Sequence, residues 1–169
     1  MTAITNFEFS AAKWRTIGLA TLATWLGGCF ILDAVLMPTL YSAGMMTQPG
    51  FASAGYSLFW VFNHLELLCS ALILTSLLVM RNSGSPVARW AVPAAIGLLV
   101  IALVDTYSLT PLMSALGLQL DLFAPATELP TAMNRLHAGY WLLEVLKFVI
   151  GSALLTESWQ SIRQTSNLV

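Results

Sequence analysis

Apolar residues fill four long stretches of this chain, and short polar connections separate them. The stretches cover about residues 14–41, 55–80, 90–116 and 134–159, and each has at least the 20 or so residues that cross a bilayer. They lack the alternation typical of a half-buried strand, and a single segment in lipid satisfies its own backbone only as a helix. We therefore predict an all-α fold, a four-transmembrane-helix bundle that forms a single integral membrane domain over residues 1–169.

Composition supports the same class of protein. The chain is 57% hydrophobic and only 9% charged, whereas soluble domains carry about 25% charged residues. A net charge of −1 without a basic patch argues against a nucleic-acid partner. The two cysteines, Cys29 and Cys69, fall inside apolar runs, where we expect small buried hydrophobes. The expected partner is the lipid bilayer, of a plasma (inner) membrane or an internal photosynthetic membrane, and a larger membrane complex or a homo-oligomer stays open.

Charge in the connections predicts the orientation. Basic residues gather on the side of the two termini and the second connection: Lys13, Arg15, Arg81, Arg89 and Arg163. The opposite side has only Arg135, so the positive-inside rule places both termini in the cytoplasm. The first apolar stretch ends without a small-residue cleavage site, and we expect it to be retained as a span.

Each predicted span carries a carboxylate: Asp33, Glu66, Asp105 and Glu144. An ionisable side chain at the centre of a transmembrane helix costs at least about 2.5–3.5 kcal/mol on insertion scales. Such groups face the interior of a bundle, where they pair with one another or with a ligand. The sequence therefore predicts an intramembrane polar site.

The two halves of the chain resemble each other around these residues. The interval from Asp33 to Asp105 is nearly the same as the interval from Glu66 to His137. Such a shared offset predicts two pseudo-symmetric helical hairpins related by an axis along the membrane normal. Chance similarity between apolar helices is the alternative.

Counting along the spans suggests where the polar groups lie. At about 1.5 Å per residue, Asp33, Glu66, Asp105 and His137 fall within about two turns of the outer face. Glu144 and Lys147 fall deeper, and their i, i+3 spacing lets them neutralise each other. The candidate ligand- or ion-binding residues are therefore Asp33, Glu66, Asp105, His137, Glu144 and Lys147.

Several functions are compatible with this set. Carboxylates beside a histidine suit a site that binds or passes a proton, a cation or the polar head of a lipophilic molecule. His137 and Glu66 are the candidate ligands of a divalent metal. A haem on His137 or His64 would make the protein a membrane redox protein, and an accessory subunit is the third alternative. No nucleophile or phosphate-loop motif occurs, which favours a role other than catalysis.

Three segments carry a resemblance to known families: WLGGCFILDAVLMPTLYSAGMM, FNHLELL and MNRLHAGYWLLEVLK. They resemble an uncharacterised four-span membrane family, a domain of unknown function common in photosynthetic bacteria. The first helix is also distantly similar to those of the CopD-type copper-resistance and HemJ-type haem-synthesis membrane proteins, on Trp25, Gly27, Gly28 and Pro38. The resemblance implies the four-span architecture, and the distant one implies handling of metal or haem.

Overall fold

The computed structural model describes residues 2–45, 48, 50–119 and 131–166. These residues are mostly helical, and they contain no β-strand. In chain order the elements are α1 (Thr2–Phe30), η1 (Ile31–Leu36), α2 (Met37–Ser42), α3 (Phe51–Asn82), α4 (Ala91–Val104), η3 (Asp105–Leu109), α5 (Thr110–Gln119) and α6 (Thr131–Ser166). Because η1 and η3 are π-helical turns inside longer helices, these elements make four continuous rods.

The four rods are long and apolar enough to cross a membrane, which confirms the predicted spans. Their spanning parts are Ala11–Ser42, Phe51–Asn82, Ala91–Gly117 and Thr131–Gln160. Their boundaries lie within about one helical turn of the predicted ones. The connection between the third and fourth predicted stretches lies mostly outside the described residues, because 120–130 are not among them.

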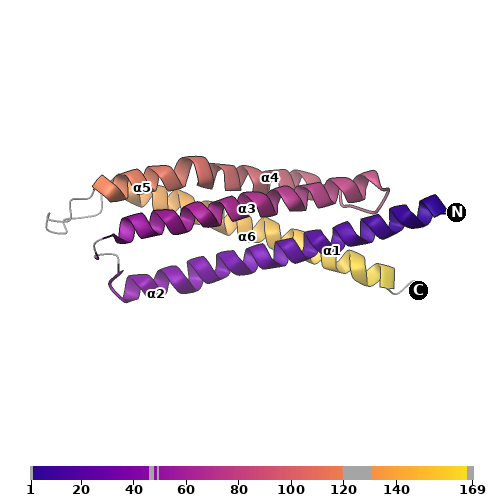
Figure 1. Cartoon of the computed structure of the whole chain (residues 1–169), viewed down its shortest axis with the longest axis horizontal. Helices are drawn as coiled ribbons and strands as arrows, with labels where there is room; N and C mark the ends of the chain where they lie inside the picture. The colour runs from indigo at the N-terminus through magenta and orange to yellow at the C-terminus, as the bar shows by residue number, and fades with distance from the viewer. Residues whose placement is uncertain (1, 46–47, 49, 120–130, 167–169) are drawn as a thin grey trace.

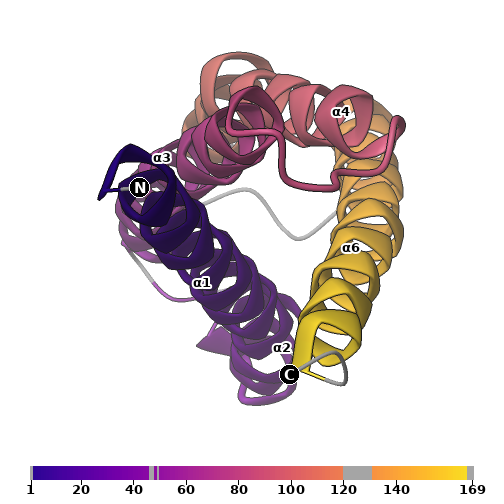
Figure 2. The same ribbon diagram turned by 90° about the vertical axis from the view of Figure 1, so that its right-hand side faces the viewer.

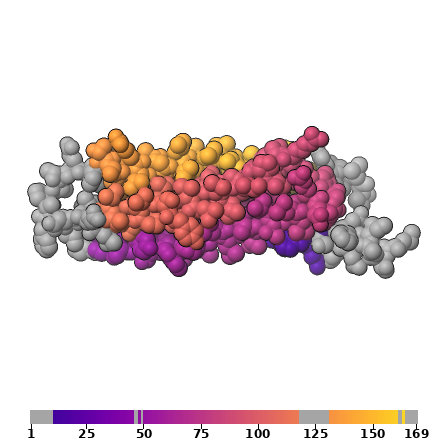
Figure 3. Space-filling model, turned by 90° about the horizontal axis from the view of Figure 1, so that it is seen from above, coloured from indigo at the N-terminus to yellow at the C-terminus, as the bar shows by residue number. Residues whose placement is uncertain are grey.

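The rods lie roughly side by side, and both ends of the chain are at the same end of the bundle (Figure 1). Seen along the bundle, the rods form a ring (Figure 2). Their order around it is α1 with α2, α3, α4 with α5, and α6. The outline is an elongated rod (Figure 3). We call the end with the two termini the terminal end and the opposite one the distal end.

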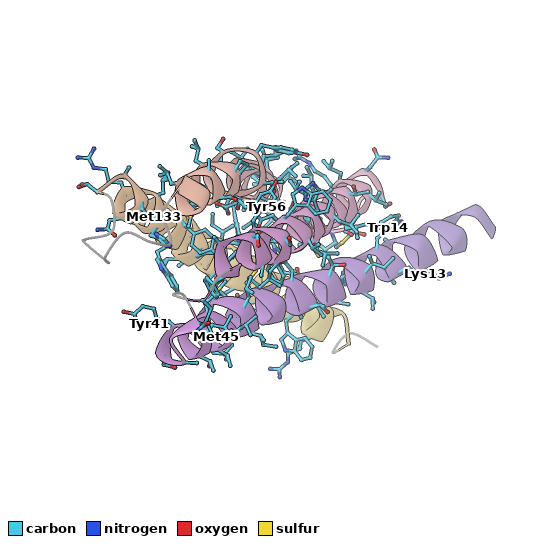
Figure 4. All side chains as sticks on the ribbon, turned by 60° about the vertical axis from the view of Figure 1, so that its left-hand side comes forward. Lys13, Trp14, Tyr41, Met45, Tyr56 and Met133 are labelled. Atoms are coloured by element: carbon cyan, nitrogen blue, oxygen red, sulfur yellow. The ribbon has the colours of Figure 1, made fainter. Side chains whose placement is uncertain are left out.

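Residues near each end of the bundle can be located by their side chains. Lys13 and Trp14 lie toward the terminal end, whereas Tyr41, Met45 and Met133 lie toward the distal end (Figure 4). Large apolar side chains such as Leu142 are exposed along the rods. Such a surface suits contact with a lipid bilayer, and the protein is of the multi-pass membrane type.

Close contact between helices occurs at Gly18 and Gly151. A Cβ on Gly151 would lie 2.7 Å from Leu26 Cδ2, and one on Gly18 would lie 3.1 Å from Ser76 Cβ. Any larger residue at position 151 would force the Leu26 side chain to move, so Gly151 allows the close contact between α1 and α6.

Candidate functional site: a buried lysine among carboxylates

Two π-helical turns place two aspartates in the interior. Asp33 lies in η1 and Asp105 begins η3, and both side chains are buried. Each of these two wide turns is closed by the residue directly before a proline. The N–H of Met37 donates to the carbonyl oxygen of Leu32, and the N–H of Thr110 donates to the carbonyl oxygen of Asp105. A proline cannot donate to the helical ladder, so the wider turn beside Pro38 and Pro111 accommodates this interruption.

Lys147 is the centre of the site. Its side chain is fully buried, and its ammonium group donates to both carboxylate oxygens of Glu66 at 2.8 Å. It also donates to Glu144 Oε1 at 2.5 Å. An ammonium group has three N–H donors, and the two glutamates accept all of them.

Asp105 completes the group around the lysine. Its Oδ2 lies 3.7 Å from Lys147 Nζ, which is a charge contact beyond hydrogen-bond distance. The residue is fully buried, yet neither Asp105 oxygen has a hydrogen-bond partner among the described residues, and the same holds for Glu144 Oε2. Buried polar atoms are normally hydrogen-bonded, so these three oxygens are the unsatisfied part of the site.

A second polar pair lies beside this group. Tyr140 Oη donates to Asp33 Oδ1 at 2.7 Å, which joins α6 to η1. The bond therefore ties Asp33 to the helix that also carries Glu144 and Lys147.

Cys29 also belongs to the site. Its thiol donates to Glu66 Oε1 at 3.0 Å, and the residue is fully buried. It is buried as predicted, but its contact with a glutamate was missed. Cys29 lies about one helical turn before Asp33 and thus near the same helix face, and this shared face was the signal that could have found it.

The site lies at a different depth in the bundle from the one predicted from the sequence. We measure depth from the distal ends of the helices, at Phe51, Gln119 and Thr131. At about 1.5 Å per residue, Glu66, Asp105 and Lys147 all lie about 21–24 Å from those ends. Glu66 and Asp105 therefore lie deeper than predicted, at the level of Lys147 near the middle of the spans, because α3 begins earlier and α5 ends later than the predicted spans.

His137 lies nearer the distal end. Its Nδ1 is 3.0 Å from the carbonyl oxygen of Met133 on the preceding turn, so the ring is held by its own helix. His64 behaves in the same way, with Nδ1 2.6 Å from the carbonyl oxygen of Trp60 and its ring 4.2 Å from the Trp60 ring. Neither of these hydrogen bonds joins a histidine to the lysine site.

A metal does not fit this arrangement as it stands. Oxygens of Glu66, Asp105 and Glu144 lie within 4.8 Å of one another, a spacing at which carboxylates can hold a cation. The ammonium group of Lys147 contacts all three of these residues and already takes both Glu66 oxygens and one Glu144 oxygen, so a metal ion would meet a like charge at short range. The resident cation of this site is therefore the lysine, and His137 lies outside this group of carboxylates.

Fold and site together define a multi-pass, all-helical membrane protein with a charged group in its interior. A family model described as a domain of unknown function (DUF4149) matches residues 20–120. The chain belongs to this family. The match includes Cys29, Asp33, Glu66 and Asp105, whereas the contribution of α6 lies beyond it. No curated protein and no solved structure matches this chain.

Proposed function

We propose that this protein binds a proton at the middle of its transmembrane bundle and relays it among carboxyl groups. The single observation that carries the proposal is the excess of carboxylates over ammonium groups in the described interior. Glu66, Glu144 and Asp105 surround one lysine, Lys147, and all four are almost completely buried. An uncompensated charge in a low-dielectric interior costs several kcal/mol, so a proton on a carboxyl group is the simplest way to reduce that cost.

Asp105 is the expected holder of the proton. The two glutamates accept all of the lysine's hydrogen bonds, whereas the Asp105 oxygens accept none among the described residues. The ionisable groups around Asp105 are Lys147 and Glu144 from α6, Glu66 from α3 and Asp33 from η1. A neutral carboxyl group loses less than a carboxylate when it is taken out of water. We expect Asp105 to take up a proton from water and to exchange it with Glu144, since oxygens of these two residues lie within 4.8 Å of each other.

Vibrational difference spectroscopy of the purified full chain in detergent tests this proposal. A protonated carboxyl group has its own C=O stretching band, and we expect such a band in the wild type at neutral pH. The Asp105→Asn variant should lose part of it, and the matched control Glu157→Gln, at a carboxyl group outside the site, should keep it. Absence of the band in the wild type, together with a stoichiometric bound metal, would refute proton binding.

Other parts of the sequence interpretation remain proposals. A single domain over residues 1–169 with cytoplasmic termini suits a relay across the membrane, and the basic residues near the termini support that orientation. The distant likeness to CopD-type and HemJ-type proteins, the haem alternative and the accessory-subunit alternative stay predictions. A visible absorption spectrum of the same sample tests the haem alternative, since bound haem would give an intense band.

A further inference from the structure

The polar and apolar residues of the interior are divided along the bundle axis. We propose that the proton site is reached from the distal end only, and that an apolar layer closes it toward the terminal end. This inference deepens and rests on the proposed function, because it concerns the access route to the same site. It follows from which buried side chains lie on either side of Lys147 along the axis.

The apolar layer contains one residue from each span: Leu22, Ile73, Leu98 and Leu154. Each of the four is at most 3% exposed, and all belong to one buried cluster that also includes Trp25 and Leu26. At about 1.5 Å per residue, these four residues lie about 30–35 Å from the distal ends of their helices. The layer is therefore about 10 Å closer to the terminal end than the lysine site.

On the distal side of the site, hydrogen-bonded polar side chains lie beside two buried apolar ones, Leu32 and Met133. Asp33 and Tyr140 form their hydrogen bond at about 13–14 Å from the distal ends of their helices. On the neighbouring helices, Asn63 Nδ2 donates to Thr110 Oγ1 at 2.7 Å, in the same half of the bundle. Hydrogen-bonding side chains of this kind can pass a proton or hold water.

The terminal side offers no comparable chain among the described hydrogen bonds. Ser70 and Ser76 are buried there, but each hydroxyl donates to a carbonyl group of its own helix, Leu67 and Leu72. Four fully packed aliphatic side chains leave a proton no hydrogen-bonding partner in that layer. The wild type should therefore load its site from one side without leaking protons through the bundle.

A polar substitution in the layer tests the barrier. We expect Leu98→Asn, in full-chain protein reconstituted into vesicles with an internal pH dye, to raise proton leak at least about tenfold, which equals a barrier lower by about 1.4 kcal/mol. The matched control is Val100→Asn on the same helix, where the side chain is 51% exposed. Adding Asp105→Asn to the Leu98 variant should abolish the leak. A folded Leu98→Asn variant that leaks no more than the control would overturn the proposal.

Labelling of Cys29 tests the direction of access even if the leucine variant does not fold. In a Cys69→Ser background, a small charged thiol reagent that cannot cross membranes is added to either side of the vesicles. Tyr41→Cys and Trp159→Cys, in a background without the native cysteines, mark the distal and terminal sides, because both positions are exposed. We expect Cys29 to react only from the side where Tyr41→Cys reacts.

The labelling result separates the two proposals. Reaction of Cys29 from the terminal side, or from neither side, would overturn one-sided access whatever the vibrational spectra show. Reaction from the distal side in a protein without a protonated carboxyl group would leave the access route standing and refute the proton as its cargo.

Discussion

Replacing Lys147 with methionine removes the only ammonium group that contacts Glu66, Glu144 and Asp105 among the described residues. Methionine has a similar length and no charge, so the change keeps most of the volume. Removing one partner of a buried ion pair costs about 3–5 kcal/mol. We expect Lys147→Met to reach the upper part of that range, because the lysine donates three hydrogen bonds and its acidic partners are buried away from bulk water.

The loss of stability in Lys147→Met should be smaller at acidic pH than at neutral pH. Without the ammonium group, the folded variant must neutralise its carboxylates by taking up protons that the unfolded chain does not hold at neutral pH. A folded state that binds more protons than the unfolded state becomes more stable as pH falls. The deficit of Lys147→Met relative to wild type should therefore shrink toward acidic pH.

A double-mutant cycle locates the interaction. Glu66 accepts two of the three hydrogen bonds, so Glu66→Gln with Lys147→Met should cost less than the sum of the single changes, by about 1–3 kcal/mol. The measurement is the free energy of unfolding in mixed micelles of increasing denaturing detergent. Lys13→Met, at the exposed lysine, is the control and should change stability by less than about 1 kcal/mol. If Lys147→Met matches this control at neutral pH, the charged interior is not what holds these helices together.

Two further variants probe single contacts, and the same unfolding assay measures both. Gly151→Ala should lower the free energy of unfolding by about 1–3 kcal/mol because its Cβ would overlap Leu26. The control Gly27→Ala, where a Cβ would have no atom within 4 Å, should be neutral or stabilising. Equal effects of the two changes would contradict the close helix contact at Gly151. Tyr140→Phe removes the hydrogen bond to Asp33 and should cost about 1–3 kcal/mol, so an unchanged stability would show that the pair contributes nothing.

Much of the architecture could be predicted from the sequence because hydrophobic length alone defines a span. The four runs predicted helices whose observed ends lie within about one turn of the expected positions, and the carboxylates within them had to face inward on energetic grounds. The partners of each carboxylate could not be predicted. A one-residue error in a helix start moves a side chain by about 100° and 1.5 Å, so spacing from a predicted start cannot decide which groups meet.

Lys147 illustrates this limit. Its spacing from Glu144 predicted a local i, i+3 pair, and that pair is present. Its contacts with Glu66 and Asp105 join three different rods, and nothing in the local sequence specifies them. The helix bounds also place Glu66 and Asp105 deeper than predicted, since α3 begins at Phe51 and not near residue 55, and α5 ends at Gln119 and not near residue 116.

The pseudo-repeat connects the local sequence to this asymmetric site. Each half of the chain has an aspartate followed by a proline about a turn and a half later, and in each half a π-helical turn joins the two. The turn is the same, but the partner differs: Asp33 accepts from Tyr140, whereas Asp105 faces Lys147 without a hydrogen bond. Both partners, Tyr140 and Lys147, lie in α6. One helix therefore gives the two similar aspartate turns different chemical environments. Different environments give two carboxyl groups different proton affinities, and the proposed relay would have a preferred direction of transfer only with such a difference.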